Sequence, residues 1–385
     1  MTAIASGPDT IQELVRDAAA AKTPLRISGR SHWIDAGRPV DATRIATIAT
    51  HSGIVDYVPG DLTITVRAGT TLREIEDVTR AEGQWLPLDP FGSKDGTIGA
   101  TIATGSFGPL AHAFGRARDL VLGVEFVTGD GKVVRGGGRV VKNVAGFDLV
   151  RLVTGSWGSI GVVTEATLRL YSLHSHPVTL SLGAPDGAAQ LAQRITSILN
   201  APGIPFAVEL IDAATAQRIG LRNQQQIIIE LGGNEAGVVA QKDALASLGG
   251  ASEIDATVWD RLRNIEEVSE PQSPPIVLRL SSRPARIAEL WSNARAVLSE
   301  AEGAFMHATL KFGVVRCVLP SDSSASLIER LAASSPGITA IFERLPHTMW
   351  QALSPSVTAD RISQGIKRAF DPSNILNPGI MGPMS

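Results

Sequence analysis

The chain has a single cysteine, Cys317, and this scarcity restricts the redox chemistry that it can carry out alone. A lone cysteine cannot form an internal disulfide, and iron–sulfur clusters usually take four thiolates. Cys317 lies in the apolar run GVVRCVLP, where a small buried residue is expected. Any redox chemistry of this chain is therefore expected to proceed without an iron–sulfur cluster of its own.

The sequence also lacks an excess of charge and any long hydrophobic run. It has 35 basic and 38 acidic residues, interspersed, which argues against a nucleic-acid footprint or a polybasic membrane anchor. The first residues show no basic segment followed by an apolar core, so no signal peptide is predicted. No stretch of about 18 apolar residues occurs either. These absences predict a cytoplasmic protein.

Two common nucleotide-binding motifs are missing. No G-x-G-x-x-G follows an expected strand, and no G-x-x-x-x-G-K-[ST] occurs. A dinucleotide bound by this chain would therefore have to be held by turns and strand ends, not by a Rossmann or P-loop framework.

Glycine, in contrast, is concentrated: 15 of the 38 glycines lie between residues 96 and 165. Glycine allows the backbone to turn sharply or to run close against a ligand. A flat, diphosphate-linked cofactor would call for such a surface. A loop-rich antiparallel sheet with many tight turns would call for it equally, so composition alone leaves both interpretations open.

Hydrophobic periodicity predicts helices and strands on both sides of this stretch. Within it, 97–104 is expected to be a short helix whose N-terminal glycines suit a diphosphate. The segment 120–138 is expected to be a hairpin around a GDG turn. The segment 24–37 is expected to be a short strand that runs into a turn. The remaining strands are predicted at 44–48, 53–58, 62–67 and 161–171, and the remaining helices at 9–21, 70–83 and 148–153.

From about residue 175 the pattern becomes a regular alternation of strands and amphipathic helices. An α+β domain with helices over one face of a sheet follows from it, and 385 residues fit two domains. The predicted strands are 178–182, 206–211, 226–231, 275–280, 312–319 and 338–343, and the helices are 186–199, 213–220, 235–248, 258–268, 284–299 and 322–334.

Several blocks of sequence carry a resemblance to a known family. They are EGQWLPLDP at 82–90, GTIGATIATGSFGP at 96–109, RDLVLGVEFVTGDG at 118–131, GGRVVKNVAGFDLVRLVTGSWGSIGVVTEATLRL at 137–170, and FDPSNILNPG at 370–379. The chain resembles the FAD-binding proteins of the vanillyl-alcohol-oxidase/p-cresol-methylhydroxylase superfamily. VKNVAGFDL narrows the resemblance to the smaller FAD-binding subunit of bacterial glycolate oxidase, also called glycolate dehydrogenase.

This resemblance implies an α+β fold with a two-lobed FAD-binding domain and a ferredoxin-like α+β cap domain. The FAD-binding domain is expected at 1–174 and the cap at 175–355. A C-terminal segment, 356–385, is expected to return to the FAD-binding domain through its Asn377-Pro378-Gly379 turn.

The resemblance also assigns cofactor-binding residues. Residues 28–32 correspond to a pyrophosphate loop, and Asn377 corresponds to a tail residue near the isoalloxazine. Some members attach FAD covalently through a histidine in the first loop; Arg30 is nearest to that position and His32 lies two residues on, so non-covalent FAD is predicted. The full set is Ser28, Gly29, Arg30, Ser31, His32, Gly96, Thr97, Gly99, Ala100, Gly105, Ser106, Gly161, Val162 and Asn377.

Catalytic residues are harder to assign, and no general base can be named. His307, Arg316 and Lys142 are the candidates, with Arg316 able to bind a carboxylate bidentately. Each also has an ordinary structural interpretation, such as hydrogen bonds that hold a loop around Lys142. Larger relatives carry a pair of histidines as metal ligands in the cap, but the matching segment MHATLKFGVVRC keeps only His307, so no metal site is predicted.

The resemblance implies a subunit that takes part in oxidising glycolate, or a similar 2-hydroxy acid, to glyoxylate or the corresponding 2-oxo acid. Electrons would pass to a partner with iron–sulfur clusters, and the implied partners are a larger FAD-containing subunit and an iron–sulfur subunit. These partners would hold the chain peripherally at the inner face of the cytoplasmic membrane. Two alternatives stay open: a non-catalytic structural subunit that keeps the flavin fold, or a self-sufficient FAD-dependent oxidase of another small hydroxy acid.

Overall fold

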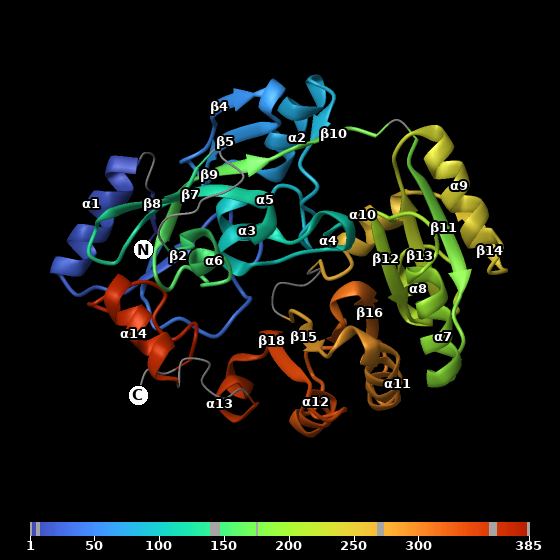
Figure 1. The fold of residues 1–385 in the computed structure, drawn as a ribbon. Coiled ribbons are helices and arrows are strands. Elements are labelled where there is room, and N and C mark those ends of the chain that lie inside the picture. Colours follow the sequence, from blue (N-terminus) through green and yellow to red (C-terminus); the bar gives the residue numbers. More distant parts are fainter. Residues whose placement is uncertain are drawn as a thin grey trace. The chain divides into compact units, whose positions relative to one another are not determined.

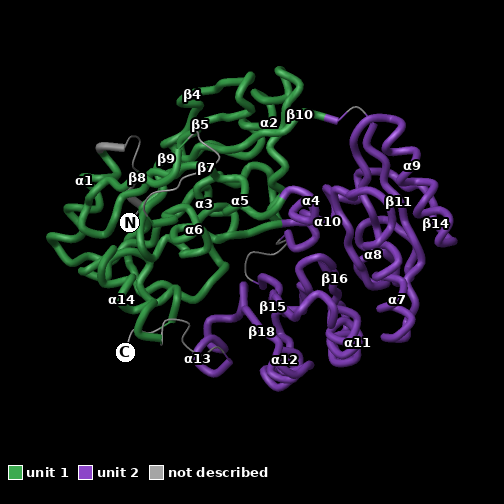
Figure 2. Tube along the Cα trace, in the orientation of Figure 1, with its two compact units in different colours: residues 1–107, 115–173, 355–385 green, residues 108–114, 174–354 purple. Residues whose placement is uncertain are grey.

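A computed structural model describes residues 2–4, 8–138, 147–174, 176–267, 273–353 and 360–382. The chain divides into two compact units (Figure 2). The first unit contains residues 1–107, 115–173 and 355–385, and the second contains residues 108–114 and 174–354.

The first unit is built on two sheets (Figure 1). A three-stranded parallel sheet has the order β1 (Thr2–Ile4), β3 (Arg44–Thr47), β2 (Leu25–Ser28). A five-stranded antiparallel sheet has the order β4 (Ile54–Val58), β5 (Thr63–Arg67), β9 (Val162–Arg169), β7 (Val121–Val127), β8 (Val133–Gly137). A small ribbon pairs β6 (Gln84–Trp85) with β10 (Tyr171–Ser172).

Short helices complete the first unit. The helix α3 (Ile98–Thr104) packs against β9, and the side chains of Ile98, Ile102 and Phe126 are all fully buried. The helices are α1 (Pro8–Ala20), α2 (Leu72–Ala81), α3 (Ile98–Thr104), α5 (Ala117–Leu120), α6 (Leu149–Val153) and α14 (Arg361–Phe370), with a 3₁₀ turn, η1, at Pro59–Asp61.

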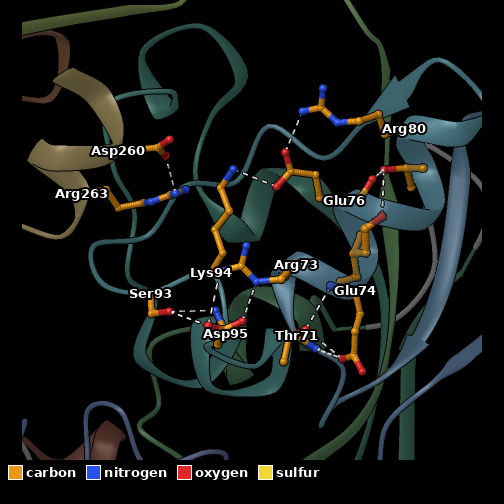
Figure 3. A network of polar contacts seen from close by, with 12 residues as sticks. Thr71, Arg73, Glu74, Glu76, Arg80, Ser93, Lys94, Asp95, Asp260 and Arg263 are labelled. Carbon is orange, nitrogen blue, oxygen red and sulfur yellow. Dashed lines mark hydrogen bonds and ion pairs between the residues drawn. The ribbon is translucent and has the colours of Figure 1, made fainter. Parts of the chain in front are cut away.

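The loop after α2 is tied to that helix by charged side chains, as Figure 3 shows. Thr71 and Glu74 form a reciprocal cap at the start of α2. Arg73 pairs with Asp95 at 2.7 Å, and Lys94 pairs with Glu76 at 2.8 Å. These contacts fix the position of residues 93–95, which lead directly into α3.

The C-terminal segment lies along β2 of the same unit. Leu25 N donates to Ile375 O at 2.7 Å, and Asn377 N donates to Leu25 O at 2.9 Å. On the other side of the segment, Gly129 N donates to Phe370 O at 2.8 Å. The tail thus contacts both the parallel sheet and the β7–β8 turn.

The second unit is one antiparallel sheet of eight strands with helices packed on it. The strand order is β14 (Ala251–Ile254), β11 (Val178–Gly183), β13 (Gln226–Leu231), β12 (Ala207–Ile211), β16 (Phe305–Thr309), β17 (Val314–Leu319), β15 (Ile276–Ser281), β18 (Thr339–Arg344). The helices are α4 (Ala111–Phe114), α7 (Ala188–Leu199), α8 (Ala213–Arg218), α9 (Glu235–Ala246), α10 (Thr257–Arg263), α11 (Ile287–Leu298), α12 (Ala325–Ala332) and α13 (Trp350–Leu353), with 3₁₀ turns η2 (Pro284–Arg286), η3 (Leu310–Phe312) and η4 (His347–Met349).

This sheet contains the ferredoxin-like pattern twice. In the first half the spatial order is β14-β11-β13-β12, so the fourth strand of that half lies at the edge and the second strand lies at the centre of the sheet. The second half, β16-β17-β15-β18, has the same order read from the other edge of the sheet. The second strands of the two halves, β12 and β16, pair at the centre, where Leu210 lies opposite Ala308. The predicted ferredoxin-like cap is therefore present as a duplicated unit, which the sequence alone did not indicate.

One segment of the glycine-dense stretch belongs with the second unit. Lys311 Nζ donates to His112 O at 2.5 Å, and the ring of Phe114 meets that of Phe206 edge to face at 5.0 Å. Sequence alone gave no indication that residues 108–114 have these contacts.

Candidate FAD-binding site

A cleft of about 1050 Å³ opens in the first unit, entirely among residues of that unit. This volume includes space that is open to solvent. Three stretches and the tail form its walls: the loop after β2, the segment from residue 90 through α3, the turn that leads into β9, and Asn377.

The loop after β2 lines this cleft and has free hydrogen-bond donors. Within the part of the chain that the structure describes, the backbone N–H groups of Arg30, Ser31 and His32 have no hydrogen-bond partner. Ser31 adopts φ +63°, a left-handed conformation of the kind that turns successive N–H groups toward one anion. The Ser28 hydroxyl is buried and also has no partner among the described residues. Such a set of donors suits the oxygens of a diphosphate.

Close packing explains why this loop needs Gly29. A Cβ atom on Gly29 would lie 2.4 Å from Thr97 Oγ1, so the loop and the start of α3 are in direct contact. Thr97 caps α3 by accepting a hydrogen bond from Ala100 N at 3.3 Å. The two predicted diphosphate segments are thereby brought side by side.

The base of α3 also depends on a close approach. A Cβ on Gly99 would lie 2.7 Å from the Ala68 Cβ, and Gly99 N donates to Ala68 O at 2.9 Å. Gly161, on the opposite wall, would place a Cβ 2.4 Å from the ring of Phe126. Glycine is required at both positions by packing behind the cleft, independently of any contact with a cofactor.

Thirteen of the fourteen predicted cofactor-binding residues line this cleft. The exception is Gly105, which ends α3 in a left-handed conformation with φ +64° and donates to Thr101 O and Ile102 O. Direct binding of FAD by the thirteen stays a prediction. Sequence reasoning had not named Arg26, Trp33, Phe91 and Trp157, which also line the cleft. Trp157 lies inside the block at 137–170 and Phe91 directly follows the block at 82–90, whereas Arg26 and Trp33 flank the expected pyrophosphate loop at 28–32.

Asn377 lines the cleft and is also held by hydrogen bonds within the protein. Its Oδ1 accepts from Ile27 N at 2.7 Å, and its Nδ2 donates to Trp157 O at 2.7 Å. The side chain is buried and joins three segments of the backbone. Its amide is therefore used mainly to fix the tail against the cleft walls.

The residues of the cleft fit an FAD molecule. Unpaired N–H groups and a buried hydroxyl offer donors to a diphosphate, and Arg30 adds a positive charge on the same loop. Arg26, behind them, donates to Ile34 O and Ala36 O and so braces the loop. Burial lowers the pKa of Arg26. Aromatic rings from Trp33, Phe91 and Trp157 offer apolar surface to a ring system.

The catalytic candidates of the second unit are engaged in internal contacts. Arg316 is buried and pairs with Glu266 through both ends of its guanidinium fork, and its third nitrogen lies 2.5 Å from Glu343. Burial alone would lower the pKa of Arg316, but these two carboxylates raise it overall. The expected carboxylate clamp is thus occupied by carboxylates of the protein itself.

His307 and Lys142 gain no catalytic assignment. His307 is buried at the central seam of the sheet, where its Nδ1 lies 3.1 Å from Glu209 Oε2. Lys142 lies outside the described residues. Cys317 is buried on β17, and burial raises the pKa of its thiol.

Two further features concern metals and membranes. Over the described ranges, no three His, Cys, Asp or Glu side chains come together in a way that could hold a metal ion. None of the helices in the same ranges has the length and apolar character needed to cross a membrane.

Comparison with known proteins finds FAD-linked families. Residues 1–137 match the family model "FAD binding domain", and residues 357–381 match "FAD linked oxidases, C-terminal domain". The chain is 30% identical to glycolate oxidase subunit GlcE of Escherichia coli (strain K12), over 96% of this chain and 95% of that protein. It is 25% identical to glycolate oxidase subunit GlcD of Bacillus subtilis (strain 168), over 97% of this chain and 87% of that protein.

The fold is shared with a solved structure as well. Alkyldihydroxyacetonephosphate synthase superimposes with a TM-score of 0.70 at 15% identity, covering 98% of this chain and 76% of that one. The predicted α+β fold is thereby confirmed. The chain belongs to the FAD-linked oxidases of the vanillyl-alcohol-oxidase/p-cresol-methylhydroxylase type and is an FAD-dependent oxidoreductase.

Proposed function

We propose that this chain is the FAD-binding subunit of a complex that oxidises glycolate, or a closely related 2-hydroxy acid, to the 2-oxo acid. The observation that carries the proposal is the similarity to glycolate oxidase subunit GlcE along nearly the whole of both chains. The cleft supports it, because the segments that the resemblance assigns to the cofactor converge there.

The reaction removes two electrons and two protons from the CH–OH group of the acid. FAD, when bound, would supply the hydride-accepting chemistry for this oxidation. The chain's own contribution is to hold the diphosphate with the loop at 28–32 and to shield the ring system with the aromatic side chains of the cleft. The chain has only one cysteine, and it is buried, so onward transfer of electrons is assigned to an iron–sulfur partner.

The partners proposed are a larger FAD-containing subunit and an iron–sulfur subunit. Support comes from relatives that are named as subunits of glycolate oxidase. In this arrangement the chain works in the cytoplasm and reaches the inner face of the membrane only through these partners.

A second candidate, a structural subunit that keeps the flavin fold, is favoured by one specific observation. Arg316, the residue best suited to bind a substrate carboxylate, already binds Glu266 and Glu343. A 2-hydroxy acid would have to displace a buried carboxylate to reach it. This observation favours substrate oxidation on another subunit over a self-sufficient oxidase.

The test uses the full chain, purified alone and then with its two partners. The visible spectrum is recorded before and after denaturation and separation of protein from small molecules. Flavin released by denaturation supports non-covalent FAD, whereas colour that stays with the protein contradicts the prediction from Arg30 and His32.

Anaerobic glycolate then separates the functions. Bleaching of this chain's flavin only in the presence of the partners supports the proposed redox subunit. Bleaching without partners supports the self-sufficient oxidase, and flavin that stays oxidised in a turning-over complex supports the structural subunit. D-Lactate and D-2-hydroxyglutarate, tried in the same way, define the acid.

A further inference from the structure

Trp157 has an unusual backbone conformation at the wall of the cleft. Its φ is +55°, in the left-handed region that bulky side chains rarely adopt. Residues held in such a conformation persist only when their surroundings enforce it, and they cluster at functional sites. The contacts that enforce it here are therefore informative.

Two hydrogen bonds hold the Trp157 peptide groups. Trp157 N donates to Ala103 O, near the end of α3, at 2.7 Å. Trp157 O accepts from Asn377 Nδ2, also at 2.7 Å. Asn377 is itself anchored, because its Oδ1 accepts from Ile27 N at 2.7 Å. The left-handed turn at Trp157 is thus held between α3 and the C-terminal segment.

The side chain of Trp157 continues the same connection. The ring lies against Gly37, where a Cβ would be 2.9 Å from Trp157 Cζ3 and 2.6 Å from Ile380 Cδ1. A Cβ on the next residue, Gly158, would lie 2.9 Å from Asn377 Nδ2. Trp157 and Asn377 both line the cleft, so a change in the tail is transmitted directly to its wall.

We propose that Asn377 is a positioning residue that holds Trp157 in its left-handed conformation, and that the C-terminal segment thereby sets the affinity of the cleft for FAD. The inference concerns FAD binding and does not depend on the identity of the hydroxy acid. Because coupling between two binding events is reciprocal, FAD must in turn stabilise the docked tail.

A double-mutant cycle on the full chain, stripped of FAD, tests the proposal. The dissociation constant for FAD is measured by titrating flavin fluorescence in wild type, Asn377→Ala, Trp157→Gly and the double variant. Asn377→Ala is expected to weaken FAD binding by about tenfold, through the loss of buried hydrogen bonds. Glycine adopts positive φ without support from its neighbours. In the Trp157→Gly background, Asn377→Ala is therefore expected to raise the dissociation constant for FAD by less than about threefold.

Asn374 supplies a matched control. It also has a left-handed backbone, with φ +49°, and lies three residues earlier in the same segment, but it does not line the cleft. Its side chain makes no hydrogen bond within the described part of the chain. Asn374→Ala is expected to leave the affinity for FAD unchanged. Equal losses from Asn377→Ala in both backgrounds would show that Asn377 acts without Trp157, which overturns the proposal.

A second measurement uses the wild-type chain, so it tests the proposal even if one of the variants fails to fold. Hydrogen exchange is followed at the amides of Asn377 and Ile380, which donate to Leu25 O and Asn377 O. Saturating FAD is expected to slow exchange at both amides. If both amides exchange at the same rate with and without FAD, in a protein shown to bind FAD, the proposed coupling between the tail and FAD binding is wrong.

Discussion

The ammonium group of Lys367 lies 2.6 Å from a carboxylate oxygen of Asp371, one helical turn further on, and both side chains are buried. Lys367 also donates to Ser159 O at 2.6 Å and to Leu376 O at 2.9 Å. Asp371 accepts from the backbone N–H groups of Ile375 and Leu376. The pair therefore joins α14, the tail and the turn before β9, which is the framework on which Asn377 and Trp157 depend.

Replacing Lys367 by methionine is expected to destabilise the first unit by about 3–5 kcal/mol, because Asp371 would remain as a buried, unpaired carboxylate. The double variant Lys367→Met/Asp371→Asn is expected to recover part of that loss. Urea unfolding followed by far-ultraviolet circular dichroism measures both. The exposed pair Arg73–Asp95 is the control: Arg73→Met is expected to change stability little. An equally small effect of Lys367→Met would contradict the role given to the buried pair.

A second prediction concerns the contact between the two diphosphate segments. Gly29→Ala is expected to raise the dissociation constant for FAD at least about tenfold, because its Cβ would meet Thr97 Oγ1 at 2.4 Å and push the loop from α3. Gly60→Ala is the control, since no atom lies within 4 Å of a Cβ there. Flavin fluorescence titration reads both. Unchanged affinity in Gly29→Ala would mean that the loop does not form the diphosphate site.

Local patterns in the sequence predicted much of this fold. The hairpin at 120–138 appears as β7 and β8 around Gly129–Gly131, and the helix expected at 70–83 appears as α2, which Thr71 caps. Such features depend on turn chemistry and capping, which act between residues close in sequence. The strands β14 and β16 were not predicted. β16 is buried throughout and β14 is a short edge strand, so neither shows the alternation of a half-exposed strand.

The site was predicted less completely, for a physical reason. The resemblance located most of the residues that line the cleft, but not the partners that define what each side chain does. Asn377 bonds to Ile27 across 350 positions in sequence, and Arg316 finds Glu266 across 50. No local pattern encodes such pairs. As a result, the internal partners of Asn377 and Arg316 could not be predicted from the sequence.

A third prediction separates two roles for Arg316. If Arg316 is a structural ion-pair centre, Arg316→Lys keeps the charge but loses the planar fork, and stability is expected to fall by about 1–3 kcal/mol. The KM for glycolate in the assembled complex is then expected to stay unchanged. Arg330→Lys, in the exposed pair with Glu300, serves as the control. A raised KM for glycolate in Arg316→Lys, with unchanged thermal stability, would instead support binding of the substrate carboxylate by Arg316.

The last prediction concerns pH and Glu230 on β13, whose strand neighbours are Thr179 and Ala207. Burial, with a smaller contribution from Asp260, raises the pKa of Glu230 to about 7. In the unfolded chain this carboxyl ionises near its ordinary value of about 4.3. The folded state therefore binds the extra proton between these values, and the stabilisation present below the unfolded pKa is lost as pH rises toward 7. Glu230→Gln removes the ionisable group and is expected to stabilise the second unit at pH 8 by at most about 4 kcal/mol, with little effect at pH 4. Denaturant unfolding at the two pH values measures this, with the exposed Glu329→Gln as control. The same stability difference at both pH values would mean that folding does not raise the pKa of Glu230.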